Sequence, residues 1–435
     1  MPRPTAIFQF DVMGGSLSSK HSKIIFATPN GCIGITGSFA QKYAKHMPLD
    51  IKMPVLSPRH VQLIKQNWSA ICVGTAVFDP EKHGSPDKFF HRTFYSLLFN
   101  AEPCLRAIFR SSLTMQGKSL ASIIKVMTGV MTTTNIVDRM QALATSHLKF
   151  GVRKEDYATM GVTLIKTLEI ISGPGAWSRD VKEAYLTAYC LLFYLILPVV
   201  VHYAPDPMQE SLACAITHVE AVTPRARRLT LAFDFPLRFQ PGDGILLGAG
   251  NSKVAFPIAS FHDKATSTLD ICVDVATSDW LCRQAMCSKL RLFWVVSNVN
   301  FEIDTPESLP QNVLLVSQGG VCAAPFQAMI EGLHSVRDSF PGHVVALQCA
   351  PSEDEVAPVR SPVVATWNQC AVHYTPQVTE ENLREFAPAA SLDQVVVIVN
   401  GPRDFIASVE KAVEAAGGKK TLVRAYSFEN IRQNR

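Results

Sequence analysis

The chain has 435 residues, too many for one ordinary hydrophobic core, so we expect two to four domains. Hydrophobic residues make up 47% of it and charged residues 18%, a composition typical of a globular protein slightly rich in apolar residues. The formal net charge of +4 is small, and no dense block of Lys and Arg follows the chain. These properties argue against a nucleic-acid-binding protein.

Eleven cysteines are spread along the chain without forming a C-x-x-C pair, which predicts reduced thiols in an intracellular protein. The longest apolar run, residues 189–201, is interrupted by Pro198. It is shorter than the ~20 residues that a membrane-spanning helix needs. We therefore expect a buried helix there, no membrane span and a cytoplasmic location.

Residues 1–52 hold many Ser and Gly, few acidic residues between Asp11 and Asp50, and no secretory signal. This composition fits a mitochondrial transit segment, which would place the protein in mitochondria. It also fits a disordered extension, or a true start at Met53. We expect a disordered N-terminal extension over residues 1–52.

Residues 53–206 carry apolar side chains at helical spacing and no strand pattern, which predicts an all-α domain. Ser57 and Ser85 are each followed by a proline, as at helix N-termini. Later helices are expected at 136–149, at 157–171, where the run S-G-P-G at 172–175 ends the helix, and at 177–203.

After Asp206 the apolar residues are spaced as in short β-strands rather than helices. This pattern predicts an antiparallel β-barrel over residues 207–307. The expected strands are 213–222, 228–233, 244–247, 268–275 and 289–294. Residues 308–435 alternate continuous apolar runs with helical stretches, which predicts a doubly wound α/β domain with a parallel sheet. Its expected strands are 313–316, 344–347 and 395–399, and its expected helices are 325–335, 379–386 and 404–416.

A candidate haem pocket lies in the all-α domain. His147 is on the apolar face of the helix at 136–149, where a haem iron would find its one neutral nitrogen ligand. Tyr95 and Gln116 can each donate a hydrogen bond to bound oxygen, worth about 1–3 kcal/mol. A structural core histidine, a tyrosine bonded to a carbonyl and a solvated glutamine are the alternatives. Together with Pro103 and Phe109, in this order, the set favours a haem pocket.

Residues 56–201 resemble a globin, and in detail the globin half of the flavohaemoglobins. The run F-Y-S-L-L-F-N-A-E-P at 94–103 is similar to the family's segment around its distal tyrosine. The resemblance implies that Tyr95 and Gln116 are the distal residues, with Leu120 beside them. It also implies that Phe109 wedges the haem against its pocket.

The same resemblance makes His147 the proximal, metal-binding ligand of the haem iron and Tyr157 the residue that supports it. One member of the proximal set departs from the family. The family's glutamate near the end of the last helix is replaced, since Val200 or His202 aligns with it. Because a carboxylate partner makes the axial histidine more basic, its loss weakens the case for oxygen activation.

Residues 213–435 resemble the ferredoxin-reductase-like half of the same family. The matching segments are T-P-R at 223–225, F-Q-P-G at 239–242 and N-G-P at 400–402. The resemblance implies binding of FAD and of NADH or NADPH. However, the family's Arg-x-Tyr-Ser flavin strand reads P-I-A-S at 257–260, and its glycine-rich phosphate segment reads A-T-S-D-W at 276–280.

The nicotinamide loop reads G-V-C-A-A-P at 320–325, with Cys322 in place of a glycine that lets the phosphates approach. Losing the arginine, the tyrosine and the glycines would weaken FAD binding by several kcal/mol, at about 1.5–3 kcal/mol for each charged hydrogen bond. The residues that the resemblance still assigns to cofactors here are Ser260, Gly320, Pro325, Gly401, Pro402 and Phe428, the last stacking on the flavin.

The resemblance implies a nitric oxide dioxygenase, an oxidoreductase with haem b that turns O2 and nitric oxide into nitrate. FAD and NAD(P)H, or an external reductase, would supply the electrons. Two alternatives stay open. The chain is a haem-based oxygen or nitric oxide sensor with a non-catalytic reductase-like half, or an interaction protein that has lost its cofactors.

Overall fold

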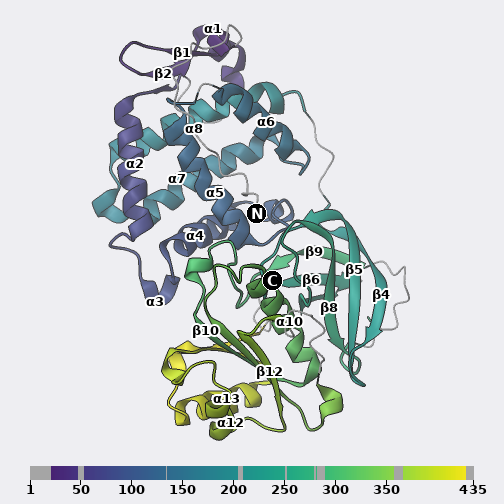
Figure 1. Ribbon diagram of the computed structural model, residues 1–435. Helices are drawn as coiled ribbons and strands as arrows, with labels where there is room; N and C mark the ends of the chain where they lie inside the picture. The colour runs from purple at the N-terminus through teal and green to yellow at the C-terminus, as the bar shows by residue number, and fades with distance from the viewer. Residues whose placement is uncertain are drawn as a thin grey trace. The chain divides into compact units, whose positions relative to one another are not determined.

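A computed structural model of the chain describes residues 21–47, 53–133, 135–203, 209–249, 252–278, 281, 290–356 and 366–427. Two compact units are present (Figure 1). The first comprises residues 1–108 and 116–209, and the second comprises residues 109–115 and 210–435. The expected boundary at residue 206 falls outside the described residues.

The first unit is helical, as the apolar spacing predicts (Figure 1). Ser57 and Ser85 are N-caps, because their hydroxyls accept from the backbone N–H groups of His60 and Lys88. The helices are α2 (Pro58–Val73), α3 (Pro80–His83), α4 (Pro86–Ala101), the 3-10 helix η3 (Pro103–Ala107), α5 (Leu113–Gly129), α6 (Ile136–Leu148), α7 (Lys154–Ala176) and α8 (Arg179–Val200).

The expected helix end at 172–175 is a kink inside α7. Gly173 has a positive φ of 66°, a conformation that favours glycine, and Pro174 follows it. A Cβ at Gly173 would lie 2.7 Å from Val77 Cγ1, so glycine also permits this close approach.

Among the described helices, α8 is long and apolar enough to cross a membrane by length and composition. However, 78% of its apolar window is buried inside the protein. That burial favours the central core helix of the first unit, against which α2, α6 and α7 pack.

The expectation of a disordered extension is wrong for residues 21–47. Two short strands, β1 (Ile25–Ala27) and β2 (Ile33–Ile35), form an antiparallel pair, and β3 (Val55–Leu56) adds a third strand to β2. The helices η1 (His21–Lys23), α1 (Gly37–Tyr43) and η2 (Ala44–His46) accompany them. The physical reason is apolar burial, since Ile25, Ile35 and Tyr43 are at most 5% exposed and β2 and α1 pack on α8.

The second unit begins with an antiparallel barrel, as predicted. Its strands are β4 (Leu212–Ala221), β5 (Ala226–Leu237), β6 (Gly244–Ala249), β7 (Ser252–Pro257), β8 (Thr266–Asp274) and β9 (Leu290–Val296), in the order β7-β6-β9-β4-β5-β8. The two end strands meet, because Ile258 pairs with Ile271 and the Ala259 N–H donates to the Asp270 carbonyl at 2.7 Å. Strand β7 was not predicted, since its six residues S-K-V-A-F-P include Lys and Pro.

A five-stranded parallel sheet follows, which confirms the predicted α/β region. Its strands are β10 (Asn312–Gln318), β11 (His343–Cys349), β12 (Cys370–Thr375), β13 (Val396–Asn400) and β14 (Val423–Ala425), in the order β12-β11-β10-β13-β14. The helices are α10 (Gly319–Ser335), α12 (Glu380–Glu385), α13 (Arg403–Ala415) and the 3-10 turns η4 (Pro306–Ser308), η5 (Glu353–Glu355), η6 (Leu392–Gln394) and η7 (Lys420–Leu422).

The two faces of this sheet carry separate cores. Val313 and Leu315 of β10 pack with Phe326 of α10, whereas Leu314 and Val316 pack with Val409 of α13. This alternation along one strand is that of a sheet covered by helices on both faces. The edge strands β12 and β14 were not predicted.

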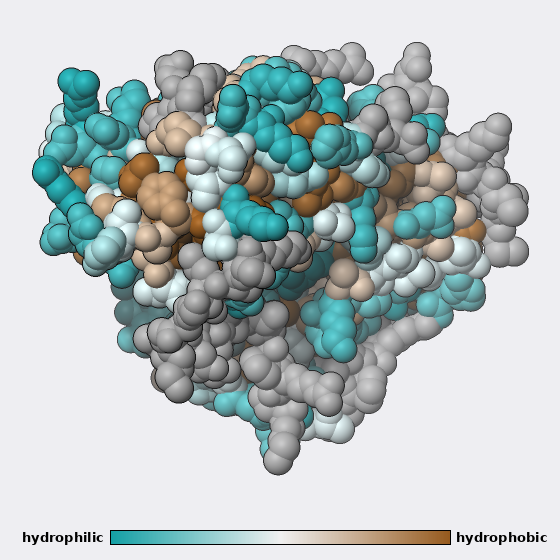
Figure 2. Space-filling view, turned by 90° about the horizontal axis from the view of Figure 1, so that it is seen from above, coloured by the Kyte–Doolittle hydropathy of each residue, from teal (hydrophilic) through white to brown (hydrophobic). Residues whose placement is uncertain are grey.

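Large apolar side chains that remain exposed are scattered over the described surface. Val73 lies on α2, and Val162 and Ile170 lie on α7. Figure 2 likewise shows hydrophobic residues interspersed with hydrophilic ones on the face it presents. Single exposed apolar side chains of this kind are ordinary on protein surfaces.

Candidate haem site and reductase-like unit

The strongest candidate site joins the end of α6 to the start of α7. His147 Nδ1 lies 2.9 Å from the hydroxyl oxygen of Tyr157. The neutral tautomer that donates from Nδ1 to this hydroxyl keeps a lone pair on Nε2. Burial lowers the pKa of His147 below its ordinary value of 6.5, which favours that neutral form. Both residues were predicted as a pair, and the structure brings them into contact.

Tyr157 is itself held by α8. The hydroxyl of Tyr189 donates to the Tyr157 carbonyl at 2.5 Å. The ring of Tyr189 packs directly against Gly161, which has no side chain. A Cβ at Gly161 would lie 2.3 Å from Tyr189 Cε1. Neither Tyr189 nor Gly161 was predicted as a site residue. A glycine on one helix and an aromatic residue on the next occur together too often in sequences to identify such a contact.

The proximal carboxylate is absent at both positions considered. Val200 is the buried last residue of α8, and His202 is exposed beyond the helix. The buried Asp156 next to Tyr157 is engaged elsewhere, because its carboxylate accepts from the backbone N–H of Arg153 at 2.7 Å and pairs with the Arg153 guanidinium. Among these residues, the Tyr157 hydroxyl is therefore the hydrogen-bond partner of His147.

Tyr95 lies in the buried face of α4. It is 4% exposed and stacks on Phe99 at 5.8 Å between ring centroids. Burial raises the pKa of Tyr95 far above its ordinary value of 10, so the phenol stays protonated and can donate. Arg106 is the charged neighbour that partly offsets this effect, and burial lowers the pKa of Arg106 to about 9.

Gln116 and Leu120 sit one turn apart on α5, close to its crossing with α4. The crossing point is Gly117, where a Cβ would lie 2.5 Å from His91 Nδ1. His91 precedes Tyr95 by one helical turn on the same side of α4. Gln116 is next to Gly117 in the chain, and the role of Tyr95 and Gln116 as a distal pair stays a prediction. Leu120 is 8% exposed.

Phe109 falls in segment 109–115, which groups with the second unit rather than with the helices that carry the other pocket residues. In that segment, Val295 N–H donates to the Arg110 carbonyl at 2.8 Å and Ser112 N–H donates to the Arg238 carbonyl at 2.9 Å. The role of Phe109 against a haem ring stays a prediction.

The proximal residues fit haem. A neutral imidazole with one nitrogen fixed by a hydrogen bond is the usual state of a histidine that binds a metal through its other nitrogen. Within the described ranges no group of three or more His, Cys, Asp or Glu gathers. A single histidine from the protein would suit a haem iron, because the porphyrin supplies the remaining nitrogen ligands.

The predicted flavin strand does not fit FAD. Pro257 ends β7, and Ala259, in place of tyrosine, is 1% exposed. The Ser260 hydroxyl, the one family residue retained, accepts from the Asp270 N–H at 3.0 Å. These residues close the barrel instead of presenting polar groups to a phosphate.

The predicted nicotinamide loop is wrong as a loop. Residues 320–325 form the first turns of α10, which begins at Gly319 directly after β10. The alanines and Cys322 favour helix over an open glycine loop. Cys322 is fixed within α10, since its carbonyl accepts from Asn400 Nδ2 at 2.7 Å, and burial raises the pKa of its thiol to about 11.

The remaining assigned positions are Gly320, Pro325, Gly401, Pro402 and Phe428. Gly320 and Pro325 are buried in α10. Pro402 is the N-cap residue of α13, and a Cβ at Gly401 would press on Phe405. Phe428 lies outside the described residues.

No protein-family model and no curated protein matches the sequence. Among solved structures, a flavohaemoglobin from Malassezia yamatoensis with bound FAD and haem shares 16% identity, with a TM-score of 0.41, over 85% of this chain and 98% of that one. The FAD/NAD-binding domain of a nitric oxide dioxygenase from Vibrio cholerae shares 16% identity, with a TM-score of 0.42, over 50% of this chain and 98% of that domain.

A cytochrome P450 reductase from Amycolatopsis shares 14% identity, with a TM-score of 0.43, over 51% of this chain and 72% of that one. Similarity at this level shows neither a shared family nor a shared activity.

Proposed function

We propose that the chain is a haem-dependent oxidoreductase that converts nitric oxide and O2 to nitrate. The observation that carries the proposal is the contact between His147 Nδ1 and Tyr157, in surroundings that keep the imidazole neutral. When bound, haem b supplies the iron at which O2 and nitric oxide meet. The overall change, NO + O2 + e⁻ → NO3⁻, needs one electron for each turnover.

The proximal residues orient the ligand. Tyr157 fixes the ring of His147 through Nδ1, and Tyr189 fixes the backbone of Tyr157 from α8. Both tyrosine hydroxyls have pKa values raised by burial, so neither loses its proton near neutral pH. This arrangement positions Nε2 without placing a negative charge beside the imidazole.

The distal residues bind the gas. The protonated phenol of Tyr95 and the amide of Gln116 are the proposed hydrogen-bond donors to the gas. Leu120 adds an apolar surface one turn beyond Gln116 and helps to exclude water. A donor aimed at partial negative charge in a dry site contributes more than the same donor in water.

The electron is proposed to come from an external reductase. This choice follows from Ala259 and Ser260, which serve the barrel and do not fit FAD. The same observation favours a second candidate, a haem-based oxygen or nitric oxide sensor in which the second unit is a scaffold. The two candidate functions differ in one measurable property: the oxidoreductase forms nitrate repeatedly, whereas the sensor does not.

Nitrate formation tests the proposal. Haem-loaded full-length chain is given O2, nitric oxide and an external reductase with its nicotinamide, and nitrate is counted per chain. We expect many turnovers, and a rate about 5–150-fold lower for Tyr95→Phe, from the loss of about 1–3 kcal/mol at one donor. Tyr203→Phe, at an exposed tyrosine, is the control. One nitrate or fewer per chain would favour the sensor.

A further inference from the structure

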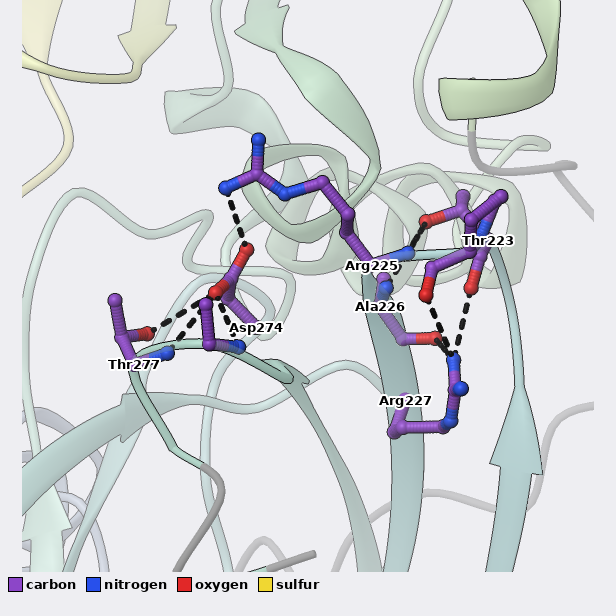
Figure 3. Close-up of polar contacts among 8 residues, drawn as sticks. Thr223, Arg225, Ala226, Arg227, Asp274 and Thr277 are labelled. Carbon is purple, nitrogen blue, oxygen red and sulfur yellow. Dashed lines mark hydrogen bonds and ion pairs between the residues drawn. The ribbon is translucent and has the colours of Figure 1, made fainter.

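The turn after β8 has its backbone donors already engaged (Figure 3). Asp274 Oδ1 accepts from the N–H groups of Ala276 at 2.9 Å and of Thr277 at 3.1 Å. On either side, Val275 N–H donates to the Arg225 carbonyl at 2.8 Å and Ser278 N–H donates to the Asp274 carbonyl at 2.9 Å. Four consecutive donors are thus bonded within the protein.

The segment 276–280 is the one that the sequence resemblance assigns to the flavin pyrophosphate. A phosphate at such a turn is held by backbone N–H groups that point outward. In the described part of this turn, a carboxylate of the chain occupies those positions. Asp274 therefore stands where a phosphate oxygen would stand.

Two arginines drawn beside the turn, Arg225 and Arg227, are also engaged. The Arg225 guanidinium pairs with Asp274 Oδ2 at 3.3 Å, and Figure 3 shows it directed at that carboxylate. Arg227 Nη1 turns the other way and donates to the carbonyls of Thr223 at 2.9 Å and Ala226 at 3.0 Å. In the described part of the turn, Arg225 is therefore paired with Asp274 itself.

The floor next to the turn is apolar. Ala226, Ala259 and Cys272 of the barrel pack with Ala324 of α10, and each is at most 6% exposed. Val222 and Val321 cover the edge of this cluster. A charged phosphate bound here would lose water without gaining a polar partner from these side chains.

We infer that Asp274 is a built-in substitute for a phosphate and that the second unit does not bind FAD at this turn. An incoming pyrophosphate would have to displace the carboxylate from two N–H groups and then face its negative charge. Losing two charged hydrogen bonds lowers affinity at least about a hundredfold. If the second unit binds no FAD, the electrons for the proposed haem function come from outside this chain. This statement about the electron source rests on the proposed function.

FAD titration of the full-length chain tests the inference directly. Flavin fluorescence and equilibrium dialysis are expected to show no saturable binding. A saturable complex of one FAD per chain would overturn the inference. The Soret absorbance of the same samples reports haem separately, so a protein that lacks haem and also lacks FAD contradicts the proposed function alone.

Hydrogen exchange tests the role of Asp274 itself. In Asp274→Ala, the peptide that covers residues 275–278 is expected to exchange at least tenfold faster at Ala276 and Thr277, while strand β9 keeps its protection. Asp274→Asn keeps an acceptor oxygen and is expected to retain most of the protection, which also guards against general unfolding. Unchanged exchange in Asp274→Ala, with β9 intact, would overturn the inference.

Discussion

Replacement of Asp243 by alanine is expected to destabilise the second unit by about 2–6 kcal/mol. Asp243 is fully buried directly before strand β6 of the barrel. Its Oδ2 accepts from the Gln240 N–H at 2.8 Å, and its Oδ1 accepts from Asn300 Nδ2 at 2.7 Å. Alanine leaves both donors buried without this acceptor, at about 1–3 kcal/mol each.

The assay is hydrogen exchange of the β6 peptide, which measures the free energy of local opening within the second unit. Asp263→Ala, at an exposed aspartate of the same unit, is the matched control and should stay within about 0.5 kcal/mol of the wild type. A loss below about 1 kcal/mol for Asp243→Ala would refute the reasoning that these two bonds are structural.

The pH dependence of stability, compared between the wild type and Asp243→Asn, gives a second readout for Asp243. Burial raises the pKa of Asp243 from 3.8 to about 6, so the folded state binds the proton more tightly than the unfolded state. The resulting stabilisation is complete below pH 3.8 and is lost as the pH rises through 6, a change of roughly 3 kcal/mol. Asp243→Asn cannot titrate and should lack this slope. A wild type and an Asn variant with parallel profiles would contradict the raised pKa.

Three further predictions concern the first unit. Tyr157→Phe removes the partner of His147 Nδ1 and should speed haem dissociation about 10–100-fold in a haem-transfer assay, while an unchanged rate would remove Tyr157 from the proximal role. Gly161→Ala presses on Tyr189 and should lower stability by about 1–3 kcal/mol in urea unfolding, whereas Gly175→Ala, which meets no atom within 4 Å, should not, and equal effects would refute the close packing. Tyr95→Phe should raise the O2 dissociation rate about 5–150-fold in stopped-flow mixing, and no change would exclude Tyr95 as the donor.

Much of the architecture follows from local sequence patterns. The serine–proline pairs at residues 57 and 85 mark helix starts because a capping hydroxyl and a fixed φ act within one turn. The apolar run at 313–316 identifies a strand buried on both faces for the same local reason. Strand β14 could not be predicted, because its three residues V-R-A are too few to show an alternation of apolar and polar side chains. Its position is set by pairing with β13.

The residues of the candidate site also fall into those that the sequence could predict and those that depend on tertiary packing. His147 is marked in the sequence by its place on an apolar helix face, whereas its pairing with Tyr157 follows from the family resemblance and not from helical spacing. The role of Tyr189 depends on the packing of α8 against Gly161, a contact that no spacing within one helix encodes. The role of Asp274 could likewise not be predicted from the sequence, because it depends on a turn that brings the N–H groups of Ala276 and Thr277 to its carboxylate.

Haem ligation by His147 tests the central claim most directly. Full-length chain reconstituted with haem b is predicted to show a Soret band of histidine-ligated iron with one haem per chain. His147→Ala should lose that ligation state and recover it on addition of imidazole, while His202→Ala, at an exposed histidine, should match the wild type. A His147→Ala variant that keeps the wild-type band and ligation state would contradict the account.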